Sequence, residues 1–357
     1  MGPFMETVLE FKLINPVPPR VFGFPQIRFM GSKYRLLPWI YRILCQLDFS
    51  TALDPFSGSG CVSYLLKSMG KQVTASDFLN FSSIIAKALI ENPGIVILPE
   101  DIEFLLTEDL SHPKFIERKF NGIFFEPGDL RFLDRVRWNI EKMGNRYKRA
   151  LATSALIRSC VKRQPRGVFT VAGDPAKYKD GRRDLKLSLR QHFEEQVWEY
   201  NQAVFDNGKK NHATKSNVFD MEPTNYDLVY MDPPYVPRSD DNCYIKRYHF
   251  LEGLSCYWEG FEIIESSKVK KIKKLFTPFS YRKTAISAFD RMFARFSKSS
   301  LVLSYSSNAY PDVPILVEIM KRYKDKVDIF EQDHRYHFGT HKSVRRNQVK
   351  EFLIVGT

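Results

Sequence analysis

The sequence has few cysteines, and none of them form a pair at metal-ligand spacing. The five cysteines in the 357 residues are scattered and make no C-x-x-C pattern. They are Cys45, Cys61, Cys160, Cys243 and Cys256. Such a set argues against a zinc ribbon or a disulfide framework and favours a reducing interior. His334, His337 and His341 lack cysteine or acidic partners at ligand spacing, so we expect surface or core histidines and no metal site.

Long apolar runs and targeting signals are also missing. No apolar run approaches the ~18 residues that a membrane helix needs. Residues 1–15 contain no basic stretch followed by an apolar core, so we expect no signal peptide. We therefore expect a cytoplasmic protein without a membrane partner.

Acidic residues are fewer than basic residues. The chain has 54 Lys and Arg against 41 Asp and Glu, a net charge of +13. A positive surface favours a polyanionic partner, nucleic acid before membrane, although a merely basic protein would show the same balance. The length and the 43% hydrophobic content allow one large α/β domain with a smaller inserted one.

The stretch 51–60 predicts a strand and a glycine-rich turn, with a helix over 61–69. This is how a nucleotide-type binding unit begins, but neither the dinucleotide G-x-G-x-x-G nor a Walker Gly-Lys-Ser/Thr is present. Asp54 at the strand end therefore suits a ligand with an ammonium group better than a diphosphate. A second strand over 72–76 ends in Asp77, where an acidic residue grips a ribose diol or caps the helix predicted over 81–89.

The run Asp232-Pro233-Pro234-Tyr235 ends the buried strand predicted over 226–231. The prolines stop both strand and helix. A carboxylate, a backbone carbonyl and an aromatic ring then lie together at the carboxyl end of a strand. These groups suit hydrogen bonding to an exocyclic amino group while a ring stacks on its heterocycle, although an ordinary strand-ending turn has the same sequence.

Residues 1–27 are punctuated by prolines and predict an extended lead-in. The segment 28–33 then opens a helix predicted over 34–47. Lys33 at that turn is either an anion contact or a solvated lysine. After the central strand we expect further strands over 301–305, 326–330 and 351–355, with helices over 249–258, 281–297 and 312–323.

Between about 105 and 211 the chain leaves the strand–helix alternation, and helices are predicted over 130–143 and 148–161. Residues 146–190 contain thirteen Lys or Arg against three Asp. Such a basic insertion is either a nucleic-acid-reading region or a solvated face. The candidate DNA contacts are Arg158, Lys162, Arg163, Arg166, Lys177, Lys179, Arg182 and Arg183, with Lys270 and Lys271 in a second basic cluster.

Three motifs in this order resemble those of the Dam-like, alpha-group DNA N6-adenine methyltransferases. They are the Met30–Lys33 segment, the Asp54–Gly60 turn and the Asp232–Tyr235 tetrad. The segments 248–250, 304–308 and 346–353 are similar too, so the resemblance covers about 27–357, loosely over 105–215.

The resemblance implies a Rossmann-like class I methyltransferase sheet, mostly parallel, with seven strands of which the last is antiparallel. It implies a lead-in at 1–27, a catalytic domain at 28–104 and 212–357, and a helical, basic target-recognition insertion at 105–211. It also implies S-adenosylmethionine as cofactor and double-stranded DNA as partner. The implied cofactor residues are Met30, Lys33, Asp54, Phe56, Ser57, Gly58, Gly60, Asp77, Phe78, Phe219, Asp220 and Asp232. The implied catalytic residues are Asp232, Pro233, Pro234 and Tyr235, acting on a flipped adenine.

Alternatives stay open at this point. They are RNA N6-adenine methylation, cytosine N4 methylation, which usually has Ser in place of Asp232, and an inactive DNA-binding module of the same fold. We also expect a role in restriction–modification or phage protection, with or without a cognate endonuclease. We expect a monomer.

Overall fold

The computed structural model describes residues 16–109, 111–165, 167–172, 181–223, 226–237, 244–335 and 348–357. Its centre is a seven-stranded sheet in the order β3-β2-β1-β4-β6-β9-β8. Strand β9 runs antiparallel to β6 and β8, and the other neighbouring pairs are parallel. The predicted α/β class, with seven strands of which the last is antiparallel, is confirmed. The strands are β1 (Thr51–Asp54), β2 (Gln72–Asp77), β3 (His212–Lys215), β4 (Leu228–Met231), β6 (Ser300–Ser306), β8 (Val327–Arg335) and β9 (Gln348–Gly356), beside a separate pair of β5 (Val236–Pro237) and β7 (Ala309–Tyr310).

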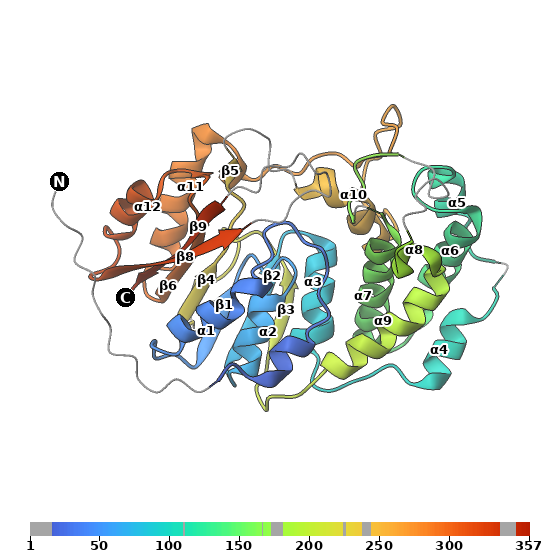
Figure 1. The fold of residues 1–357 in the computed structure, drawn as a ribbon, viewed down its shortest axis with the longest axis horizontal. Helices are drawn as coiled ribbons and strands as arrows, with labels where there is room; N and C mark the ends of the chain where they lie inside the picture. The colour runs from blue at the N-terminus through green and yellow to red at the C-terminus, as the bar shows by residue number, and fades with distance from the viewer. Residues whose placement is uncertain are drawn as a thin grey trace.

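Helices cover both faces of the sheet (Figure 1). Because side chains alternate along a strand, Leu228 and Tyr230 of β4 join the core on one face, while Val229 and Met231 join the core on the other. The first face is covered by α1 (Leu37–Leu44), α2 (Cys61–Ser68) and α3 (Asn80–Ala86), and the second by α11 (Arg282–Arg295) and α12 (Val313–Met320).

The remaining helices gather at one end of the sheet (Figure 1). Helix α7 packs against α9, α6 and α3, and α10 packs against α3 and α7. The helical region therefore packs against α3, which covers the first face of the sheet. Its helices are α4 (Pro99–Leu106), α5 (Phe115–Phe120), α6 (Pro127–Lys142), α7 (Arg146–Arg163), α8 (Arg183–Lys186), α9 (Leu189–Ala203) and α10 (Tyr244–Ser255). The domain boundaries proposed from the sequence stay predictions.

Several element boundaries differ from the predicted ones for local reasons. The helix predicted over 34–47 is a 3-10 turn, η2 (Tyr34–Leu36), followed by α1, which has Pro38 in its first turn. The helix predicted over 249–258 lies at 244–255, and Tyr257 and Trp258 after it have positive φ values of 54° and 60°. Strand β3 was not predicted, because its four residues are mostly exposed and show no apolar run.

Short turns complete the described chain. They are the 3-10 turns η1 (Pro19–Gly23) and η5 (Pro278–Ser280) and the π-helical turn η3 (Lys87–Glu91), which continues α3. Cys45, Cys61, Cys160 and Cys256 are free thiols, whereas Cys243 lies outside the described residues. None of the helices within the described ranges is both long and apolar enough to cross a membrane.

Candidate active site

The carboxyl ends of three parallel strands meet at one edge of the sheet, and each carries a carboxylate. Asp54 ends β1, Asp77 ends β2, and Asp232 directly follows β4. The strand order reverses between β1 and β4, which is where open α/β sheets bind ligands. A pocket lies at this edge, and all three carboxylates line it.

Most of the predicted cofactor residues line this pocket. Those that do are Met30, Lys33, Asp54, Phe56, Ser57, Gly58, Asp77, Phe78 and Asp232. Gly60, Phe219 and Asp220 are not among the lining residues. Phe219 reaches the pocket only indirectly. Its ring stacks on Phe279 with 5.7 Å between centroids, and Phe279 contacts the lining residue Phe56 edge-on.

The glycine turn after β1 depends on backbone freedom. Gly58 and Gly60 have φ values of 51° and 83°, a conformation that L side chains rarely adopt. A Cβ atom on Gly58 would also lie 3.0 Å from the Phe29 ring. The Gly58 amide donates a hydrogen bond to Oδ2 of Asp77 at 2.8 Å. The turn is therefore fixed against β2 with its backbone facing the pocket.

Asp54 and Asp77 are buried carboxylates with short-range partners. Asp54 accepts hydrogen bonds from the Ser63 hydroxyl at 2.6 Å and the Phe56 amide at 3.3 Å. Asp77 accepts one from the Leu79 amide at 2.8 Å, and so holds the start of α3 as well as the glycine turn. Burial raises the pKa of both carboxyls to about 7, and these hydrogen bonds oppose the rise only in part. A cation bound between them would favour their ionised forms.

Asp232 forms an ion pair with Lys33. The Lys33 Nζ atom lies 3.1 Å from Oδ1 of Asp232, and the two side chains are 3% and 21% exposed. The solvated-lysine alternative is therefore wrong. Burial raises the pKa of Asp232 to about 6, although the Lys33 charge acts in the opposite direction. Lys33 and Asp232 both line the pocket, and the role of this pair in the site stays a prediction.

The tetrad is anchored on its far side. Tyr235 is half-buried, and its ring meets that of Tyr305 at 65° with 5.7 Å between centroids. Strand β5 follows Tyr235 at once and pairs with β7. The turn is therefore held at both ends, by β4 before it and by β7 after it.

An aromatic group outside the predicted set holds the lysine segment in place. Phe29 stacks on Tyr248 with 5.2 Å between centroids and 4° between planes, and on Tyr244 with 5.5 Å. The Met30 amide donates a hydrogen bond to the Tyr248 hydroxyl at 2.7 Å. The four-residue spacing of the tyrosines on α10 could have indicated this pairing. The lining residues outside the prediction include Phe29, Gly31, Ser32, Ser59, Cys61, Val62, Leu79, Tyr230 and Tyr244.

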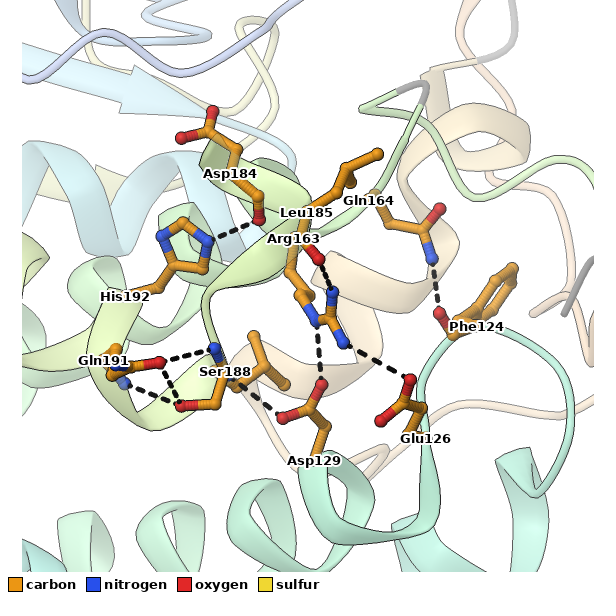
Figure 2. A network of polar contacts seen from close by, with 11 residues as sticks. Phe124, Glu126, Asp129, Arg163, Gln164, Asp184, Leu185, Ser188, Gln191 and His192 are labelled. Carbon is orange, nitrogen blue, oxygen red and sulfur yellow. Dashed lines mark hydrogen bonds and ion pairs between the residues drawn. The ribbon is translucent and has the colours of Figure 1, made fainter. Parts of the chain in front are cut away.

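Two of the predicted DNA contacts have internal partners. Figure 2 shows Arg163 reaching Asp129 of α6 at 3.0 Å, the Leu185 carbonyl at 2.6 Å and Glu126 at 3.7 Å. Asp129 also accepts from the Leu189 amide of α9 at 3.0 Å. The Arg163 side chain is only 11% exposed, and it joins α7 to α6 and α8 directly and to α9 through Asp129. Arg158 is 12% exposed, and it likewise pairs with Glu199 and donates to the Gln26 carbonyl at 2.8 Å. Both arginines therefore make contacts within the protein. A DNA role for them stays a prediction.

Replacing Arg163 with alanine is expected to lower the free energy of unfolding by about 3–5 kcal/mol, because it leaves the mostly buried Asp129 without its counter-charge. Arg190→Ala is the matched control, since Arg190 is 59% exposed and, among the described residues, pairs only with Glu194 one turn away. About 0.5 kcal/mol or less is expected there. Denaturant unfolding followed by circular dichroism measures both. Equal unfolding midpoints, with DNA affinity lost only in Arg163→Ala, would instead assign Arg163 to phosphate contact.

The other basic candidates are more accessible. Arg183 is 65% exposed and pairs with Glu195, and Lys162 lies 3.6 Å from Asp184. Arg182 donates to the Pro165 carbonyl at 3.0 Å, and Lys270 pairs with Glu265 at 3.2 Å. Lys271 is half-buried, and Arg166, Lys177 and Lys179 lie outside the described residues.

The sequence predicts no metal site. Within the part of the chain that the structure describes, no three His, Cys, Asp or Glu side chains lie close enough together to hold a metal ion. His337 and His341 lie outside it. The expectation that the site needs no metal stays a prediction.

Comparison with protein families decides the class. The family model of D12 class N6 adenine-specific DNA methyltransferases matches residues 29–298. The chain belongs to this family. The match includes the lysine segment, the glycine turn and the tetrad, and the protein is therefore an adenine-specific DNA methyltransferase.

Curated relatives agree with this placement. The methyltransferase is 28% identical to the type II methyltransferase M2.HphI of Haemophilus parahaemolyticus, over 93% of this chain and 98% of the relative. It is 25% identical to the type II methyltransferase M.FokI of Planomicrobium okeanokoites, over 92% of this chain but only 52% of that protein. It is also 22% identical to the type II methyltransferase M.NlaIII of Neisseria lactamica, over 90% and 95%. The chain therefore spans nearly all of two of these relatives and about half of the third.

Proposed function

We propose that this methyltransferase transfers the methyl group of S-adenosylmethionine to the N6 amino group of an adenine flipped out of duplex DNA. The observation that carries the proposal is the position of Asp232. It lies at the carboxyl end of β4, in one pocket with Asp54 and Asp77 and directly before the Pro-Pro-Tyr turn.

The pocket residues fit this cofactor chemically. The cofactor carries a sulfonium, an ammonium and a carboxylate, together with a ribose diol and an adenine. Asp54 would accept from the ammonium and Asp77 from the ribose hydroxyls. The buried Ser57 hydroxyl, which has no hydrogen-bond partner among the described residues, adds a polar group for the same ligand. Phe56 would provide an apolar surface for the adenine of the cofactor. Phe279 packs behind Phe56, and Phe219 stacks on Phe279.

The proposed mechanism follows from the weak nucleophilicity of the adenine amine, whose lone pair is delocalised into the ring. Asp232 and the Pro233 carbonyl accept its two N–H groups and thereby localise the lone pair on nitrogen. Tyr235 stacks on the flipped base, which leaves the duplex at a cost of a few kcal/mol. S-adenosylmethionine supplies, when bound, a methyl group already activated by the sulfonium. The task of the protein is therefore alignment, and the proton can leave after transfer.

We place the DNA along the basic surface beside the pocket. The segment between α10 and α11 runs along the top of the molecule in Figure 1, beside α5, to which it is tied by the Lys119–Glu265 ion pair of 2.6 Å. Farther along, the ring of its residue Phe279 meets that of Phe56, which lines the pocket, edge-on. Lys268, Lys273 and Lys274 are exposed on this segment, which places them well for phosphate contact.

Removing two of these charges should weaken DNA binding in a salt-dependent way. For Lys268→Gln/Lys273→Gln, the slope of log affinity against log salt should fall by about 0.9 per lost phosphate contact. The control is Lys321→Gln/Lys326→Gln, which removes the same amount of charge. These two side chains are 55% and 67% exposed. They precede β8 and therefore lie at the amino ends of the parallel strands, opposite the pocket. Fluorescence anisotropy with a labelled duplex at several salt concentrations reads both. Equal slopes for the two variants would rule out this surface.

The experiment that tests the proposed function is methyl transfer from labelled S-adenosylmethionine to unmethylated duplex DNA, followed by nucleoside analysis and modified-base sequencing. We expect N6-methyladenine in one short sequence context. Label in cytosine would overturn the base, and label in RNA alone would overturn the substrate. No transfer to either nucleic acid would leave a DNA-binding module of this fold.

We also propose the biological setting. Because the relatives named above are type II methyltransferases, we expect a modification enzyme of a restriction–modification or protection system, paired with a separately encoded endonuclease or acting alone. It would work as a monomer in the cytoplasm, since methylating one strand at a time needs no symmetry.

A further inference from the structure

Glu351 is a buried carboxylate on a strand that is otherwise apolar at this point. It lies near the start of β9 and is followed by Phe352, Leu353, Ile354 and Val355, of which the last three are buried. Because β9 runs antiparallel to β6, with Glu351 opposite Ser306, its early residues lie at the same edge as the carboxyl ends of the parallel strands. Glu351 itself is 0% exposed. A buried carboxylate at a ligand-binding edge needs a counter-charge.

That counter-charge is Lys33. The Lys33 Nζ atom lies 3.7 Å from Oε2 of Glu351 and 3.1 Å from Oδ1 of Asp232. It also donates to the Gly31 carbonyl at 3.3 Å. One ammonium is thus shared between two carboxylates, the buried Glu351 of β9 and the partly exposed Asp232 that follows β4. The cluster has one more negative charge than positive when all three groups are ionised.

We propose that Glu351 is a positioning residue for methyl transfer, which holds the Lys33 ammonium away from full pairing with Asp232 and thereby keeps Asp232 a strong hydrogen-bond acceptor for the adenine amino group. The inference rests on the proposed function. If Glu351 were neutral, the whole Lys33 charge would act on Asp232. A carboxylate that is fully neutralised in this way accepts more weakly from a neutral N–H donor.

The electrostatic surroundings of Asp232 agree in direction. The Glu351 charge helps to raise the pKa of Asp232, after burial and against the opposing effect of Lys33. The charged and titratable groups that face Asp232 come from every element around it. They are Lys33 before η2, Glu351 of β9, Asp54 of β1, Cys61 of α2, Tyr230 of β4 and Tyr244 of α10.

The test is the pH profile of methyl transfer by Glu351→Gln. We expect kcat on the high-pH plateau to fall about tenfold, a smaller loss than the hundredfold or more that removing an acid–base group outright would cause. The acid limb should move to lower pH by about half a unit or more, because removing a neighbouring negative charge lowers the pKa of Asp232. Glu331→Gln is the matched control. Glu331 lies on the neighbouring strand β8, is 58% exposed and pairs with Lys350 at 2.8 Å, so neither quantity should change.

A double-mutant cycle shows whether Glu351 acts through Lys33. In a Lys33→Gln background, Glu351→Gln should have little further effect on the kcat plateau, since the ammonium that Glu351 holds is gone, whereas its direct charge effect on the acid limb remains. Additive losses would overturn the proposal. So would a Glu351→Gln variant with a lower melting temperature but an unchanged acid limb, because a merely structural glutamate behaves in that way.

One readout is independent of DNA methylation. Carbon-13 NMR of aspartate-labelled protein, with the Asp232 signal assigned by Asp232→Asn, follows the titration of this carboxyl directly. A lower pKa in Glu351→Gln supports the coupling even if the wild-type enzyme methylates no DNA, a result that would sink the proposed function alone. If the pKa of Asp232 were unchanged in Glu351→Gln while the wild type methylated DNA normally, the role of Glu351 would be refuted and the proposed function would stand.

Discussion

Replacing Asp232 with alanine is expected to lower kcat for adenine methylation by about a thousandfold or more, because in the proposed mechanism it removes the acceptor that localises the amine lone pair. The fold should survive the change. Lys33 keeps a buried partner in Glu351, at 3.7 Å, so its charge is not left uncompensated. Cofactor binding measured by calorimetry and DNA binding measured by anisotropy should each stay within about tenfold of wild type, so that the loss lies in kcat.

The control for this variant is Asp328→Ala. Asp328 lies on β8 of the same sheet, is 39% exposed and pairs only with the exposed Lys326 among the described residues. It should methylate DNA at the wild-type rate. Single-turnover rates for the two variants isolate the chemical step from product release. Near-normal turnover by Asp232→Ala would refute the proposed mechanism and point to the Pro233 carbonyl and alignment as sufficient.

The site was readable from the sequence where the chemistry is local. The strand–turn segments that carry Asp54, Asp77 and Asp232 each combine a strand signal with a turn signal inside about ten residues. Parallel strands bring such ends to one edge, so topology alone predicts their meeting. The structure places all three carboxylates around one pocket, as expected.

What the sequence did not reveal depends on contacts between distant parts of the chain. Glu351 meets Lys33 only because β9 is antiparallel and inserted between β6 and β8. An isolated acid in an apolar strand was the available signal. Charge counting also failed to separate Arg163, which is 11% exposed inside an ion-pair network, from Arg183, which is 65% exposed. Composition records how much charge a segment has, and packing decides which way each side chain points.

Cofactor binding should release protons below pH 7, and Asp54 should supply a large share of them. Burial raises the pKa of Asp54 to about 7 in the free enzyme. A bound ammonium favours its ionised form, so the pKa falls in the complex. The group is therefore protonated more often in the free enzyme than in the complex below pH 7. By linkage, affinity rises with pH up to about 7, by at most tenfold per unit for each such group. Above about 7.8 the amino group of the cofactor loses its own proton, which ends the rise.

Asp54→Asn tests this origin directly. The variant should bind S-adenosylmethionine about ten- to a hundredfold more weakly at pH 7.5, since one charged hydrogen bond is lost. It should also release up to one proton fewer at pH 6.5, measured by titration calorimetry in two buffers of different ionisation enthalpy. Asp77, whose pKa burial also raises to about 7, remains in the variant, so part of the release should persist. If Asp54→Asn released as many protons as the wild type, Asp54 would not face the ammonium, and the acid limb of binding would belong to Asp77 and Asp232.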